Sequence, residues 1–209
     1  MKKVSILLVL SILVVGIFGC ENLKYENQKN NEGDDHDPFI FESKTEIKKS
    51  KLAAETLEEL IRKAIESQSN IQISDVKIDW VSLVDDMTIA TFIFEYSGNK
   101  YIGYIYSEYQ KKYLLNAIDI SQVNLDVPFT FINATGQQSG LDRNYHVYYG
   151  YLNNREINKI EIIYNGNIRN VLKIDGNHTF LDVTTGSKMI LNEIIGLDKD
   201  ENEIHRYKF

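Results

Sequence analysis

The residue types most often used for catalysis and metal binding, histidine and cysteine, are few and scattered in this chain. Its histidines are His36, His146, His178 and His205, and none belongs to an HExxH motif or a similar paired spacing. A zinc site needs three or four converging ligands, so we interpret the histidines as structural or surface residues. The GxSxG motif of serine hydrolases is also absent. These residues predict no enzyme activity, no metal site and no cofactor.

An acidic segment near the C-terminus has part of a calcium-binding pattern. The stretch from Asp198 to Asn202 begins like an EF-hand loop. Glu203 and Phe209, however, occupy its sixth and twelfth positions, where the loop requires glycine and a bidentate glutamate. We therefore interpret the segment as an acidic hairpin turn.

Tyrosine is the most unusual part of the composition, and one group of tyrosines is a candidate binding surface. This group is Tyr145, Tyr148, Tyr149 and Tyr151. Neighbouring strand residues point to opposite faces of a sheet, so we expect Tyr148 or Tyr149 to lie outside the core. Tyrosine is enriched in binding surfaces, and the group predicts a surface for a glycan or a peptide. The alternative is that these are ordinary sheet tyrosines.

The N-terminus has the features of a secretory signal. Lys2 and Lys3 give a positive start, and an apolar run follows from Val4 to Phe18. As an α-helix this run spans about 22 Å, which is less than the ~30 Å of hydrocarbon in a bilayer. It is therefore typical of a cleaved signal peptide, residues 1–19, and less so of a permanent span. The alternative is an uncleaved membrane anchor.

The end of that run, Ile17-Phe18-Gly19-Cys20, resembles the lipobox of bacterial lipoproteins. The resemblance implies diacylglyceryl transfer to the Cys20 thiol, cleavage after Gly19 and often acylation of the new amino terminus, for example with palmitate. Phe18 departs from the pattern, which usually has a smaller residue there. Cys20 is the only cysteine, so it cannot form an internal disulfide, and a thioether to lipid would remove a reactive thiol.

The resemblance places the mature protein on the outer face of a cell membrane, held by the lipid on Cys20. Glu21 does not supply the retention signal of the Asp type, so a Gram-negative host would carry the protein on its outer membrane. The formal net charge of the 209 residues is −7, and it becomes −9 once the two lysines of the signal are removed. Such an acidic chain is a poor match for nucleic acid.

After the cysteine, residues 20–50 are polar and charged, and we interpret them as a flexible tether. A helix is predicted over 51–69. Its apolar residues recur at helical spacing and form one stripe: Leu57, Leu60, Ile61, Ala64 and Ile65.

Four strand-like runs follow the helix, over 73–84, 87–96, 101–106 and 113–120. In the first, Val76, Ile78, Trp80 and Val84 are expected on one face. Short connections between the runs indicate an antiparallel meander with the helix on one face, an α+β domain over 51–122. The order of these elements is similar to that of the cystatin-like and nuclear-transport-factor-2-like folds.

The remaining segment, 128–209, is predicted to be a small β-sandwich-like domain. Short strands alternate with turn sequences such as Asn165-Gly166 and Asp175-Gly176. The segments containing Gly150, Ile160-Glu161-Ile162 and Leu197-Asp198 resemble the C-terminal β-modules of small uncharacterised Gram-positive surface lipoproteins. Glu201 stands where those modules have a glycine.

These patterns predict a lipid-anchored cell-surface protein that acts as a non-enzymatic binding or accessory module in the envelope. Its partner would be an envelope protein or a wall polymer. One alternative is a secreted inhibitor or immunity-type protein. Another is a hydrolase, which would require Asp79 and Glu95, the carboxylates inside the first two strands, to converge in a deep pocket.

Overall fold

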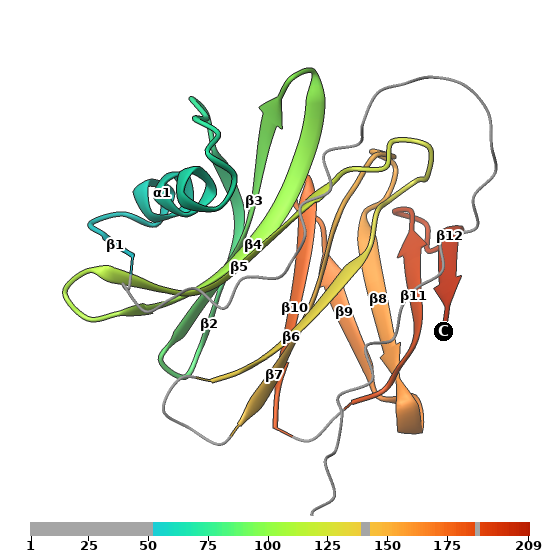
Figure 1. Cartoon of the computed structure of the whole chain (residues 1–209). Helices are drawn as coiled ribbons and strands as arrows, with labels where there is room; N and C mark the ends of the chain where they lie inside the picture. The colour runs from blue at the N-terminus through green and yellow to red at the C-terminus, as the bar shows by residue number, and fades with distance from the viewer. Residues whose placement is uncertain (1–51, 139–142, 187–188) are drawn as a thin grey trace, which may run out of the picture. The chain divides into compact units, whose positions relative to one another are not determined.

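The computed structural model describes residues 52–138, 143–186 and 189–209. These residues are mainly antiparallel β-structure with a single α-helix (Figure 1). All of them belong to one compact unit, Ile40–Phe209. The predicted signal peptide, Cys20 and the tether lie outside the described residues. None of the helices in the described part is long and apolar enough to cross a membrane.

The helix α1 (Leu57–Ser69) forms where the apolar stripe was predicted. Thr56 caps its start by accepting a hydrogen bond from the Glu59 N–H at 3.1 Å, and Asn70 ends it in a left-handed conformation. The predicted start at residue 51 is wrong, because Ala53–Ala54 instead pair as a short strand, β1, with Tyr113 and Leu114.

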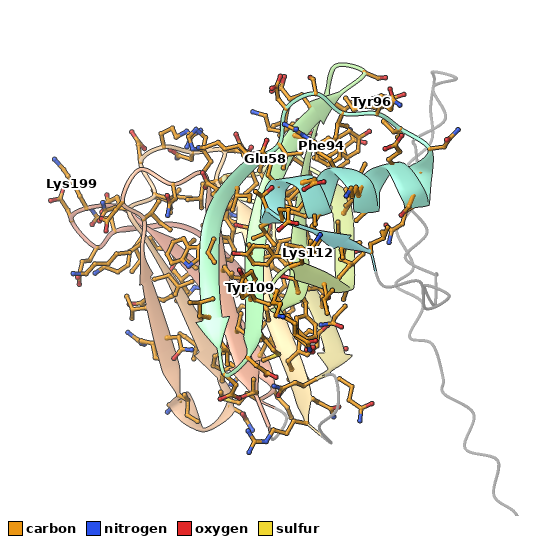
Figure 2. All side chains as sticks on the ribbon, turned by 90° about the vertical axis from the view of Figure 1, so that its left-hand side faces the viewer. Glu58, Phe94, Tyr96, Tyr109, Lys112 and Lys199 are labelled. Carbon is orange, nitrogen blue, oxygen red and sulfur yellow. The ribbon has the colours of Figure 1, made fainter. Side chains whose placement is uncertain are left out.

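Sheet A is the five-stranded sheet beneath this helix, and its strand order is β1-β5-β4-β3-β2. Its longer strands are β2 (Lys77–Val84), β3 (Met87–Tyr96), β4 (Asn99–Tyr109) and β5 (Tyr113–Gln122). The helix buries its stripe against one face of this sheet, where Leu60 and Ile61 have no exposed surface. Burial of such a side chain stabilises the fold by roughly 1.5–3 kcal/mol. Figure 2 shows Phe94 and Tyr96 of β3 on the side of α1.

The C-terminal strands form two smaller sheets. Sheet C has the order β10-β7-β6 and sheet D the order β12-β11-β8-β9. Sheet C consists of β6 (Ile132–Gln137), β7 (Asn144–Tyr151) and β10 (Thr179–Thr185). Sheet D consists of β8 (Lys159–Tyr164), β9 (Arg169–Lys173), β11 (Leu191–Leu197) and β12 (Glu203–Lys208), with a short 3-10 turn, Asn165–Asn167, between β8 and β9.

Sheet C is covered on both faces. Side chains of β7 such as Val147 and Tyr149 pack with Ile89 and Ile102 of sheet A in one core, which we call the tyrosine core. The next residue, Tyr148, packs with strands of sheet D in another. Residues from both predicted domains, 51–122 and 128–209, therefore share the tyrosine core.

The central strand β7 also approaches its neighbours closely at Gly150. A Cβ atom there would lie 2.0 Å from the Thr130 carbonyl oxygen and 2.5 Å from the Phe180 ring. Only glycine allows the backbone to pass at this distance. The missing side chain at Gly150 therefore lets β7 pack directly against the Thr130 backbone and the Phe180 ring.

An irregularity in β2 changes which face its side chains occupy. The pairing with β3 shifts between Ile78 and Trp80, so Asp79 is an extra residue with no partner in the register. Ile78 packs beneath the helix, whereas Trp80 packs with the tyrosine core and with sheet D. The expectation that Ile78 and Trp80 share one face is therefore wrong, because the bulge reverses the alternation.

Candidate functional site

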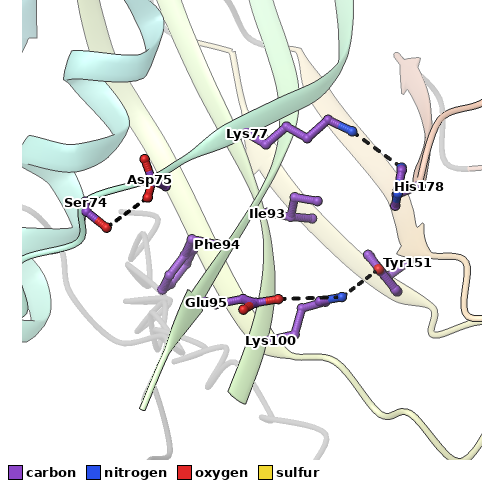
Figure 3. A pocket seen from close by; sticks show the side chains of 9 residues that line it. All are labelled: Ser74, Asp75, Lys77, Ile93, Phe94, Glu95, Lys100, Tyr151 and His178. Carbon is purple, nitrogen blue, oxygen red and sulfur yellow. Dashed lines mark hydrogen bonds and ion pairs between the residues drawn. The ribbon is translucent and has the colours of Figure 1, made fainter. Parts of the chain in front are cut away.

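A pocket of about 510 Å³ lies at one end of sheet A, beside the end of β7 and the start of β10 (Figure 3). It combines apolar side chains with charged and hydrogen-bonding ones. Its lining residues are Ser74, Asp75, Lys77, Ile93, Phe94, Glu95, Lys100, Tyr151 and His178. A concave site with a few polar groups on an apolar wall is the usual form of a small-molecule binding site.

The strand register brings the two lysines to this pocket. Lys77 of β2 pairs with Ile93 of β3, and Lys100 of β4 pairs with Glu95 of β3. Ile93 and Glu95 are two residues apart and therefore share a face of the sheet. The ammonium groups thus come from strands on either side of β3, with Ile93 between them (Figure 3).

The carboxylate of Asp79, the bulged residue, joins β2 to the start of β10. Its Oδ2 accepts hydrogen bonds from the N–H groups of His178 at 2.6 Å and Thr179 at 2.8 Å, and from the Thr179 hydroxyl at 3.1 Å. Its Oδ1 pairs with the Lys77 ammonium at 2.7 Å. Burial alone would raise the pKa of Asp79, but the bonds to Lys77, His178 and Thr179 outweigh it and hold the pKa below its ordinary value.

The same contacts set the state of His178. Its Nδ1 lies 3.4 Å from the Lys77 ammonium, which can only donate, so this nitrogen is the acceptor and carries no proton. The pKa of His178 is lowered, mainly by burial and then by the positive charges of Arg155 and Lys77, against the opposing effect of Asp79. The imidazole is therefore neutral at pH 7, and its hydrogen-bonding direction is fixed.

Lys100 is held by an aromatic residue of sheet C. Its ammonium donates to the Tyr151 hydroxyl at 3.0 Å and lies 5.0 Å from the centre of the same ring. Glu95 is 3.8 Å away, and its side chain is 74% exposed, so this ion pair is weak. The contact with Tyr151 fixes Lys100 at the pocket more firmly than Glu95 does.

The arrangement does not assemble the acid pair that a hydrolase would need. Asp79 and Glu95 do not converge, because the Asp79 side chain is buried against β10 and only Glu95 lines the pocket. Ser74 and Lys77 have the SxxK spacing of some serine enzymes. The Ser74 hydroxyl, however, donates to Asp75 at 3.1 Å, whereas the Lys77 ammonium is held by Asp79 and His178.

The four tyrosines predicted as a binding surface are all buried. Their exposed fractions are 2% for Tyr145, 5% for Tyr148, 0% for Tyr149 and 3% for Tyr151. Tyr148 and Tyr149 do point to opposite faces of β7, but the expectation that one lies outside the core is wrong, because both faces of sheet C are covered. Of the four, only Tyr151 reaches the pocket.

The other residues considered from the sequence do not come together. His178 lines the pocket, while His146 lies on β7 and His205 on β12. In the described ranges no group of three or more His, Cys, Asp or Glu side chains could hold a metal ion. Cys20 and His36 lie outside those ranges.

The acidic segment at Asp198 forms the hairpin turn that was predicted between β11 and β12. Asp198 Oδ1 accepts from the N–H groups of Asp200 and Asn202, each at 2.8 Å. These and the side-chain bond from Asn202 lower the pKa of Asp198. The carboxylate is therefore used to hold the turn.

Sequence reasoning missed the pocket because its residues come from five separate stretches of the chain. The signal it contained was a charged residue, Asp79, inside an otherwise regular strand. Comparisons with known proteins add nothing to this assignment: no protein-family model, no curated protein and no solved structure matches the chain.

Proposed function

We propose that this chain is a lipid-anchored binding or accessory module of the cell envelope, without enzymatic activity, and that the pocket beside Lys77 and Lys100 is its binding site. The observation that carries the proposal is the pocket itself. Its polar groups stand on paired strands and are held by neighbouring residues, as Lys77 is by Asp79 and Lys100 by Tyr151. A rigid, prearranged site loses little entropy when it binds a ligand.

The proposed anchor is diacylglycerol on Cys20, which would hold the body outside the membrane with the polar residues 20–50 between them. The support is the lipobox resemblance together with the positive start and the short apolar run before it. Mass spectrometry of the N-terminal peptide from the native protein tests this step. An intact Met1, or a Cys20 without an acyl group, would contradict it.

For the fold we propose the cystatin-like or nuclear-transport-factor-2-like order over 51–122, followed by a sandwich-like module over 128–209. The support is that α1 precedes the hairpin-connected strands β2 to β5 and packs on one face of them. In the second segment, sheets C and D bury apolar side chains between them. An experimental structure would test both assignments.

The binding proposal is tested by filling the pocket from a position that tolerates substitution. Glu95 is largely exposed, so Glu95→Trp should fold and place an indole over the site. The matched control is Val81→Trp, because Val81 is 51% exposed on β2 and does not line the pocket. The full chain in lipid nanodiscs is exposed to fractionated envelope material from its own cells, and retained molecules are identified by mass spectrometry.

We expect the wild type and Val81→Trp to retain the same small molecule or wall-polymer fragment, and Glu95→Trp to lose it. Equal retention by the wild type and Glu95→Trp would contradict the assignment of the pocket as the binding site.

A further inference from the structure

We infer that the pocket binds its ligand through an anionic group, a carboxylate or a phosphate, held between the ammonium groups of Lys77 and Lys100. This inference rests on the proposed function, because it names the class of ligand for the same site. It is carried by the hydrogen-bonding capacity of the two lysines, by the charges around them and by the apolar wall between them.

Lys77 keeps donor capacity after its protein contacts are made. An ammonium group has three N–H donors, and Asp79 and His178 accept two of them, at 2.7 Å and 3.4 Å. The side chain is 55% exposed and lines the pocket. The third N–H is therefore available to a ligand, while the other two contacts keep the ammonium in place.

Lys100 is similarly fixed and only weakly neutralised. Tyr151 accepts one hydrogen bond, and the phenol is a neutral partner. The other contact, with Glu95, is long at 3.8 Å and involves a side chain that solvent surrounds. A ligand anion that displaced Glu95 would gain a close ion pair at little cost, because an exposed pair contributes at most about 1 kcal/mol.

The charges near the lysines favour an anion although the chain as a whole is acidic. The positive charge of Arg155 reaches the pocket residue His178, whose pKa it lowers together with Lys77 and Lys100. The negative charge of Asp79 is already compensated by four hydrogen-bonding contacts. Asp75 is exposed to solvent, so its repulsion of a ligand is screened.

The apolar wall indicates that the ligand is larger than a free inorganic ion. Ile93 lies between the two lysines and is partly exposed, and Phe94 adds a further apolar contact to the lining (Figure 3). A volume of about 510 Å³ is within the usual range for pockets that hold small organic molecules. The class inferred is thus a small organic acid or phosphate with an apolar portion.

The test uses three probes of similar shape: phenylacetate, phenyl phosphate and the neutral phenylacetamide. The full chain in nanodiscs carries a labelled Ile93 methyl group, whose NMR shift reports occupancy, while the Ile65 methyl in the helix core reports the fold. We expect saturable shifts at Ile93 with one or both anions and none with the amide. The anion that binds more tightly, phenylacetate or phenyl phosphate, shows whether the ligand group is a carboxylate or a phosphate.

Variants then assign the effect to the lysines. Lys77→Gln and Lys100→Gln should each weaken binding about tenfold, the effect of losing one charge-assisted hydrogen bond. Lys100→Gln is the safer variant for folding because it leaves Asp79 untouched. The control is Lys112→Gln, an exposed lysine beyond the other end of β4, which should bind as the wild type does (Figure 2).

Two results would overturn the inference. The first is binding of phenylacetamide as tightly as phenylacetate, and the second is no shift at Ile93 with any probe although Glu95→Trp abolishes retention of envelope material. Both leave the binding function of the pocket in place. Failure of Glu95→Trp to change retention would instead contradict the proposed function.

Discussion

Asp79 and Asp119 are carboxylates of the same sheet, at places where sheet A meets sheet C, yet their surroundings act on them in opposite ways. Asp79 accepts two backbone N–H groups, a hydroxyl and an ammonium, and its pKa is lowered. Asp119 accepts the Tyr149 hydroxyl at 3.1 Å and the N–H of Ile120, and burial raises its pKa. The difference lies in the number of donors and in the presence of a cation.

Of these two contacts between sheets A and C, the one made by Asp79 holds the sheets together. The folded state stabilises the ionised form of Asp79, so this carboxylate favours the folded state at neutral pH. Burial disfavours the ionised form of Asp119, so its charge costs stability there. One aspartate is therefore a joint between β2 and β10, and the other is tolerated beside a buried tyrosine.

The largest loss of stability is expected when the Asp79 carboxylate is removed. Asp79→Ala leaves the N–H groups of His178 and Thr179 without their acceptor and should lower the free energy of unfolding by about 3–5 kcal/mol. Urea denaturation at pH 7 measures it. The control is Asp75→Ala, an exposed acid just before β2, which should change stability by less than about 0.5 kcal/mol. Equal losses in the two variants would refute the role of Asp79.

A smaller effect is expected one residue further from the carboxylate. The Thr179 hydroxyl donates to Asp79, so the Thr91 hydroxyl, at 2.7 Å, must donate to Thr179. Both residues are fully buried. Thr91→Val keeps the shape, removes this donor and should cost about 1–2 kcal/mol. In a double-mutant cycle with Asp79→Ala the losses of stability should be less than additive. Additive losses would mean that the hydrogen bonds from Thr91 through Thr179 to Asp79 do not act together.

On the other side of the comparison, Tyr149→Phe should cost about 1 kcal/mol. The variant removes one hydrogen bond to Asp119 and keeps the ring, which packs at 5.4 Å from that of Tyr104. Denaturation at pH 7 checks the value. A loss as large as that of Asp79→Ala would show that this second contact is also a joint.

Asp119→Asn is expected to give the smallest change in stability at neutral pH, and a gain where the other variants give a loss. The pKa of Asp119 in the folded state is raised above 3.8. Its stabilisation of the folded state is therefore fully present below that pH and is lost as the pH rises through the folded pKa. The amide that replaces the carboxylate carries no charge to desolvate. The free energy of unfolding of the variant at pH 7 should therefore lie between the wild-type value and about 0.5 kcal/mol above it.

For Asp79, whose pKa is lowered, the contribution is present above pH 3.8 and is lost as the pH falls through the folded value. Stability measured from pH 2 to 7 should therefore change in opposite directions for Asp79→Asn and Asp119→Asn relative to the wild type. Parallel curves would contradict the comparison.

Some of this arrangement could be predicted from the sequence. The stripe of α1 and the strand β3 follow from periodicity, because each keeps one repeat from end to end. The turn at Asp198 follows from its local hydrogen bonds. Such features depend on residues that are neighbours in the chain.

The burial of the tyrosines and the position of the pocket could not be predicted in this way. Whether Tyr149 is buried depends on sheet A lying over it, and the pocket joins Lys77 to His178 across about a hundred residues. Alternation along β7 gives the two faces of the strand but does not say what covers each face. Only the packing of sheets A, C and D decides that.

The bulge at Asp79 makes the length of β2 as important as its composition. Removing this one residue would leave Trp80 opposite Thr91 with its ring in the tyrosine core, but it would remove the carboxylate that accepts the N–H groups of His178 and Thr179. Related chains that share this architecture should therefore vary in length at the Asp85 turn, where the backbone already has positive φ, and keep the residue count between Lys77 and Val84 constant.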